Sequence, residues 1–115
     1  MTVELINERT QEPVATAVEI VMTRRERRKG LLGRESMNAG GAMVISPCFA
    51  VHTAFMRFSI DVAFVDHTGR AVRIVRDLRP WRMAASARAY AVIEFPAGRL
   101  EACGVEVGDR LYLSC

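Results

Sequence analysis

The sequence has no run of about 18 apolar residues, the minimum for a membrane-spanning helix, so no such helix is predicted. It has no internal repeat and no low-complexity tract, which excludes a solenoid. Only three cysteines occur, and no two of them form a CxxC pair. An odd number of cysteines without such pairs argues against a disulfide framework and favours free thiols in a reducing compartment.

What is present fits one small domain. The chain has 115 residues, of which 50% are hydrophobic and 25% charged, enough for one packed core. Its net charge of +3 is too small to indicate nucleic acid by itself. We expect a single domain over residues 1–115, with a less ordered N-terminal segment at 1–12. That segment lacks the features of a secretory signal, which predicts a cytoplasmic protein.

Short β-rich runs dominate the chain. Asp66 and Gly69 suit the tight turn of a hairpin between two of these runs. Residues 49–58 read as a mostly buried extended segment and 78–87 as a loop. Strands are predicted at 14–22, 42–46, 60–66, 71–77, 89–95 and 110–113.

Two short helices are predicted, at 24–32 and 99–103. Thr23 and Glu26 form a capping box before the first, and Gly33 would end it. Since strands do not alternate with long helices, we predict a mainly β fold. The expected architecture is a small antiparallel β-sandwich or a partly closed barrel with two short helices.

A set of motifs runs through most of the chain from Val14 onward. The most specific is Met56-Arg57-Phe58-x-Ile60-Asp61. With the runs 23–34 and 51–66, Gly69, 96–98 and 104–109, it resembles the bacterial and archaeal domain-of-unknown-function 192 family. The resemblance implies a mainly β fold and carries no activity. Many relatives look exported, a property for which this sequence shows no signal.

Asp61 is the most unusual residue of the predicted strands, because it lies in an otherwise apolar run. A buried carboxylate is costly unless it is paired. We expect a partner in Arg57 or in the backbone amides of the 58–60 turn. The alternative is a polar rim that binds a ligand. In this rim Arg57 would bind a carboxylate or phosphate, and His52 would act as an acid or base near neutral pH. Trp81, in a loop, is the fourth candidate ligand-binding residue.

Cys48 and His52 are the only cysteine and histidine that lie close together in the sequence. In an extended chain they would lie roughly 13 Å apart, too far for one zinc ion, so no metal site is predicted. No catalytic motif occurs in the sequence, and no cofactor is expected. A hydrolase or thiol enzyme centred on Cys48, His52 and Asp61 is the alternative, which requires these three side chains to converge in one pocket.

The hypothesis that we favour is a non-enzymatic binding or accessory module for a partner protein or a small anionic ligand. A weaker alternative is nucleic-acid binding through the basic helix that runs from Arg24 to Lys29. No aromatic residue interleaves that basic run, so we do not expect it to bind nucleic acid.

Overall fold

The structure is a computed structural model that describes residues 3–115. As predicted, the fold is mainly β, with 45% strand and 8% helix, and its sheets are open rather than closed into a barrel over the described residues. The helices are α1 (Arg24–Lys29) and α2 (Arg99–Ala102). The strands are β1 (Glu4–Asn7), β2 (Glu12–Ala15), β3 (Ala17–Val21), β4 (Gly41–Ile45), β5 (Ala50–His52), β6 (Ile60–Val65), β7 (Ala71–Leu78), β8 (Met83–Ala85), β9 (Ala91–Pro96) and β10 (Leu111–Ser114).

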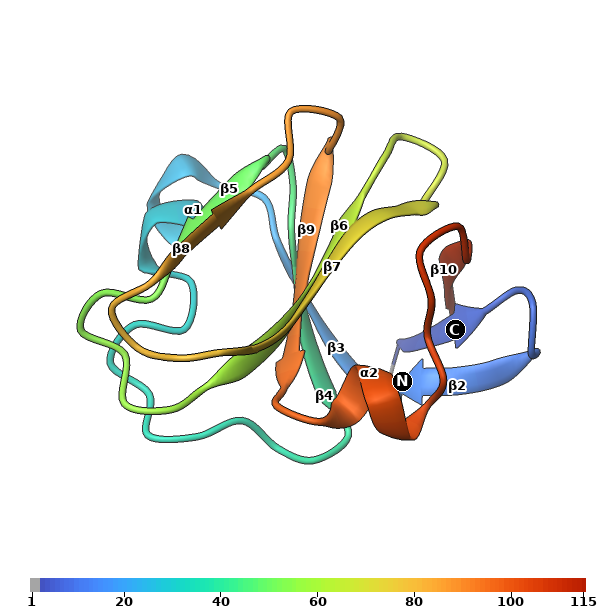
Figure 1. Cartoon of the computed structure of the whole chain (residues 1–115), viewed down its shortest axis with the longest axis horizontal. Helices are drawn as coiled ribbons and strands as arrows, with labels where there is room; N and C mark the ends of the chain where they lie inside the picture. Colours follow the sequence, from blue (N-terminus) through green and yellow to red (C-terminus); the bar gives the residue numbers. More distant parts are fainter. Residues whose placement is uncertain (1–2) are drawn as a thin grey trace.

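A five-stranded sheet in the order β3-β4-β9-β6-β7 forms the centre of the molecule. Its strands are antiparallel except for β3 and β4, which run parallel. The small β5–β8 sheet and α1 lie on one side of this central sheet. The β10-β1-β2 sheet and α2 lie on its other side (Figure 1). In the part of the chain that the structure describes, neither helix is long and apolar enough to cross a membrane.

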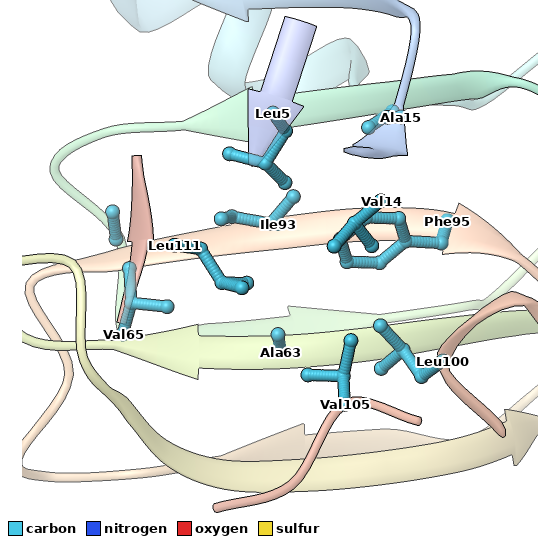
Figure 2. Close-up of a cluster of buried hydrophobic side chains, with 12 residues drawn as sticks. Leu5, Val14, Ala15, Ala63, Val65, Ile93, Phe95, Leu100, Val105 and Leu111 are labelled. Atoms are coloured by element: carbon cyan, nitrogen blue, oxygen red, sulfur yellow. The ribbon is translucent and has the colours of Figure 1, made fainter. Parts of the chain in front are cut away.

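Alternation along β6 and β9 divides the core into two clusters. Ala63, Ile93 and Phe95 face one cluster, which β1, β2, α2 and β10 complete (Figure 2). Val62 and Val92 face the other cluster, which includes Leu31 after α1 and residues of β5 and β8. The two small sheets thus cover opposite faces of the central sheet, and the side of β9 that holds Val92 faces α1 and β5.

Two local predictions are confirmed. Strands β6 and β7 form the expected hairpin, in which the Gly69 amide donates to the Asp66 carbonyl and Gly69 has a φ of 88°. The capping box of α1 is present in both directions between Thr23 and Glu26. The helix is shorter than predicted, however, because Gly30 leaves the helical conformation with a φ of 47° and ends α1 at Lys29.

Other elements differ from the prediction. The expected strand at 14–22 divides at Thr16 into β2 and β3, which belong to different sheets. The N-terminal segment, for which we predicted no strand, holds β1 at the centre of the three-stranded sheet. Only β5 is extended within 49–58, and its partner β8 lies inside the predicted loop at 78–87. Each difference depends on a partner strand that is distant in sequence.

Candidate functional site

Asp61 is fully buried, and backbone amides bind both of its oxygens. Oδ1 accepts a 2.9 Å hydrogen bond from the Asp77 amide, and Oδ2 accepts 3.0 Å bonds from the amides of Gly98 and Leu100. The expectation that Asp61 has a specific partner is thus confirmed, but the partners are not those expected. Since three elements meet at this carboxylate, it holds β6, β7 and the start of α2 together.

The predicted ion pair between Arg57 and Asp61 is wrong. Arg57 is exposed and donates a 3.1 Å hydrogen bond to Glu35 instead. The amides of the 58–60 turn do not bind Asp61 either, because the register of the β6–β7 ladder shifts beside Asp61 and brings the Asp77 amide to the carboxylate. Arg57 and Asp61 therefore do not form one rim with His52.

Trp81 and Phe55 form an exposed aromatic pair. Their ring centroids lie 4.6 Å apart at an interplanar angle of 59°, and their exposed fractions are 60% and 72%. Both residues adopt left-handed backbone conformations, with φ values of 64° and 65°. Such conformations are costly for bulky residues, typically by about 1 kcal/mol or more each, and occur where surrounding contacts enforce them.

Thr53 supplies the contacts that enforce the conformation of the 79–82 loop. Its carbonyl accepts the Trp81 amide at 3.0 Å, and its amide donates to the Arg82 carbonyl at 2.8 Å. Its hydroxyl oxygen, which is buried, donates to the Arg79 carbonyl at 2.5 Å and accepts the Arg82 amide at 2.8 Å. One buried threonine thus fixes the position of the exposed indole.

A shallow hollow lies beside the indole. Its lining comprises His52, Ala54, Trp81, Arg82 and Met83, the last with 78% of its side chain exposed. We use the name Trp81 face for the exposed side chains of His52, Phe55, Trp81, Arg82 and Met83. Two of the four predicted ligand-binding residues, His52 and Trp81, therefore lie together, whereas Asp61 is buried elsewhere.

A second hollow adjoins the Trp81 face and shares His52 with it. It has a volume of about 80 Å³ and lies between α1 and β5. Apolar residues form much of its wall: Leu31, Leu32, Ile45, Val51 and Met56. Its polar lining comprises Arg27, Lys29, Cys48, His52 and Glu94.

Glu94 is the most unusual member of this second hollow, which we name the Glu94 pocket. Its side chain is only 5% exposed, and its Oε1 atom has no hydrogen-bond partner. Burial raises the pKa of the Glu94 carboxyl to about 7, although the positive charge of Arg34 opposes this shift. Glu94 was not predicted as a site residue, although it shows the same signal as Asp61, a single carboxylate in an apolar strand.

Cys48 and His52 both line the Glu94 pocket, but their side chains are not arranged as a catalytic nucleophile and its base. The Cys48 thiol donates to the Ala50 carbonyl at 3.1 Å, and burial raises the pKa of this thiol. Within the described residues no hydrogen bond joins Cys48 to His52, and no cluster of three metal-ligating side chains occurs. Asp61, the third residue of the thiol-enzyme hypothesis, is bound to backbone amides outside this pocket.

The basic side chains of α1 that the structure describes are exposed or half-buried. Arg24 and Arg25 are exposed, while Arg27 donates to the Met22 carbonyl at 2.7 Å and lines the Glu94 pocket. That this helix does not bind nucleic acid stays a prediction, and nucleic-acid binding stays the weaker alternative.

Comparison with known proteins places the chain among uncharacterised relatives. The model of the DUF192 family, described as uncharacterised ACR, matches residues 5–113. The UPF0127 proteins of Pyrococcus furiosus and Pyrococcus horikoshii are 44% and 41% identical to the chain over 63 residues. This segment is 54% of the chain and 53% and 54% of the two relatives, so the match spans about half of their length.

Two solved structures share the fold. A proposed transcription regulator of Sinorhizobium meliloti has a TM-score of 0.83 and 24% identity, over 96% of this chain and 90% of that one. A protein of unknown function from Novosphingobium aromaticivorans has a TM-score of 0.82 and 20% identity, over 96% and 82% of the two chains. At these identities the similarity shows the fold alone.

Proposed function

This chain belongs to the DUF192 family of uncharacterised proteins, and we propose that it is a non-enzymatic binding module that docks an acidic segment of a partner polypeptide on the Trp81 face. The observation that carries the proposal is the aromatic pair of Phe55 and Trp81. Both rings are more than half exposed although both backbones are held in costly left-handed conformations. Backbone strain that holds apolar rings exposed to solvent is typical of a binding surface.

The composition of the Trp81 face resembles that of protein interfaces. Tryptophan and arginine are enriched among the residues that contribute most to binding energy, and methionine is frequent on surfaces that adapt to partners. Met83 and Trp81 flank Arg82 in sequence, and all three line the same hollow. An apolar side chain of a partner would contact the indole and thioether there.

The charge of this surface favours an acidic partner. No Asp or Glu occurs between residues 78 and 93, whereas Arg79, Arg82 and Arg88 do. Arg82 forms no ion pair with any described residue, and its only hydrogen bond from the guanidinium is to the Trp81 carbonyl at 3.3 Å. A carboxylate of a partner would therefore find a free guanidinium at the edge of the hollow.

A polypeptide fits this face better than single-stranded nucleic acid. Two neighbouring arginines are already paired with acids, Arg57 with Glu35 at 3.1 Å and Arg79 with Asp77 at 3.8 Å. Binding a phosphate backbone needs several free cations along a track. In addition, the Phe55 and Trp81 rings contact each other, which reduces the area on which a base could stack.

The test is a selection of random peptides displayed on phage against the full chain, followed by affinity measurements on the selected peptides. We expect sequences in which Asp or Glu adjoins an aromatic or aliphatic residue. Trp81→Ala should weaken binding by about thirtyfold, since a central aromatic contributes roughly 2 kcal/mol. Arg82→Glu should weaken it by about tenfold, and a peptide with Lys in place of the acid should recover the loss.

Matched controls come from exposed residues outside the face. Val107→Ser removes an exposed apolar side chain, and Arg25→Glu reverses an exposed charge, so both should leave peptide affinity unchanged. Selected peptides that lack acids, or that bind Trp81→Ala as tightly as the parent, would contradict the proposal. Tighter binding of oligo(dT) than of any selected peptide would also contradict it.

A further inference from the structure

The Glu94 pocket is a second candidate binding site, distinct from the Trp81 face although His52 borders both. Glu94 lies in β9, in the interior of the central sheet, where it pairs with Met43 of β4 and Val62 of β6. Alternation along β9 turns its side chain to the same side as Val92, toward α1 and β5. The carboxyl group therefore lies at the inner wall of the pocket.

The Oε1 atom of Glu94 is an unsatisfied acceptor beside open space. A buried polar atom without a partner is costly, and the great majority of buried polar atoms in native structures form hydrogen bonds. Gly30 borders this space, since a Cβ atom at this position would lie 4.0 Å from Oε1, in ordinary van der Waals contact. A ligand that donates an O–H or N–H group would satisfy this oxygen.

Part of the pocket's lining carries positive charge. Arg27 and Lys29 line it, and the charge of Arg34 also acts on Glu94. A cationic ligand would be repelled there, whereas a carboxylate would be attracted. A ligand that fits both features offers a hydrogen-bond donor to the Oε1 atom of Glu94 and an anionic group to Arg27 and Lys29.

Strand β5 also borders this space, since Ala50, Val51 and His52 line the pocket. In the β5–β8 pair the Phe49 carbonyl and the Thr53 amide bond to residues of the partner segment. Alternation of the antiparallel ladder then directs the amides of Ala50 and His52 to the opposite edge of β5. The Cys48 thiol, which lines the pocket, bonds to the Ala50 carbonyl on that edge.

We propose that the Glu94 pocket binds a short-chain hydroxy acid. Its hydroxyl group donates to Glu94, and its carboxylate interacts with Arg27 and Lys29. Its hydrocarbon part contacts Ile45, Val51 and Met56, which explains why a pocket with charged ends has apolar walls. A volume of about 80 Å³ suits a ligand of a few heavy atoms.

The experiment compares hydroxy acids with the acids that lack the hydroxyl group. The full chain is titrated with lactate, 3-hydroxybutyrate and 4-hydroxybutyrate, and with propionate and butyrate as their deoxy partners, by protein-observed NMR. A site built to accept a hydroxyl discriminates against the analogue without it. At least one hydroxy acid should bind at least tenfold more tightly than its deoxy partner, with shifts at Gly30 and Val51.

Two variants keep the test decisive. Glu94→Leu replaces a buried unpaired acceptor with an apolar side chain, so the fold should persist and the preference for the hydroxy acid should disappear. Lys29→Met should weaken hydroxy acid and deoxy acid to a similar extent, and Glu101→Gln, at an exposed residue of α2, should change neither affinity. Equal binding of hydroxy and deoxy acids throughout the series, or a preference that survives Glu94→Leu, would overturn the proposal.

Discussion

The backbone amide of Leu100 donates a 3.0 Å hydrogen bond to Oδ2 of Asp61, so a carboxylate in β6 holds the first turn of α2. Removing this acceptor leaves three backbone amides without their partner. Asp61→Ala should lower the free energy of unfolding by roughly 1–3 kcal/mol. Denaturant midpoints of parent and variant measure the change.

Arg57→Ala is the matched comparison for Asp61. Because Arg57 pairs only with exposed Glu35, its loss should cost less than about 0.5 kcal/mol, and the coupling energy of the double variant should be near zero. A coupling above about 1 kcal/mol would show that the two residues interact after all.

Glu94 should make the chain less stable as the pH rises. Its folded pKa of about 7 exceeds the ordinary value of 4.5, so between these values the folded chain binds more protons than the unfolded chain. Stability should fall across this window by roughly 3 kcal/mol and level off above it. Glu94→Gln should remove the fall, which urea midpoints from pH 4 to pH 8 would measure. An unchanged slope in the variant would contradict the buried carboxyl as its source.

Asp109 should make the chain less stable as the pH falls, whereas Glu94 makes it less stable as the pH rises. The side-chain hydrogen bond from Arg9 holds the pKa of this carboxyl at about 2, below its usual 3.8, with help from the Glu106 amide and Asn7. Its stabilisation is therefore present above pH 3.8 and is lost as the pH falls toward 2. Arg9→Ala should raise the pKa of Asp109, which carboxyl NMR titration would detect. A pKa that stays near 2 would assign the shift to the other two donors.

Thr53→Val should loosen the loop that carries Trp81. The substitution keeps the shape but leaves the Arg82 amide without its 2.8 Å acceptor, at a cost of roughly 1–3 kcal/mol. Near-ultraviolet circular dichroism of the single tryptophan should weaken. Thr16→Val, at an exposed threonine, is the control that should change neither signal. A loss of stability without a change at the indole would mean that other contacts position Trp81.

Local patterns in the sequence predicted those parts of the fold that local contacts determine. The Asp66–Gly69 turn and the Thr23–Glu26 capping box each depend on residues within four positions, and both are present. The need of Asp61 for a partner also followed from burial alone. Its actual donors lie 16 to 39 positions away, which no local pattern could show.

The candidate site was less predictable because it is made of distant segments. The Glu94 pocket joins the end of α1, β5 and β9, and only the pairing of the central strands brings these together. Left-handed conformations at Phe55 and Trp81 have no sequence signature, since neither residue favours them. His52 and Trp81 were predicted and lie together, and the position of Glu94 in an apolar strand was a readable signal that was not used.

The most direct test of the proposed docking surface uses Trp81 as its own reporter, since it is the only tryptophan in the chain. The full chain is titrated with an acidic peptide selected as above, and the emission maximum of Trp81 is recorded against peptide concentration. Because 60% of this side chain is exposed in the free chain, docking should bury the indole and shift its emission to shorter wavelength, with the same dissociation constant as binding measured by calorimetry. Binding that saturates by calorimetry while the Trp81 emission stays unchanged would contradict the account.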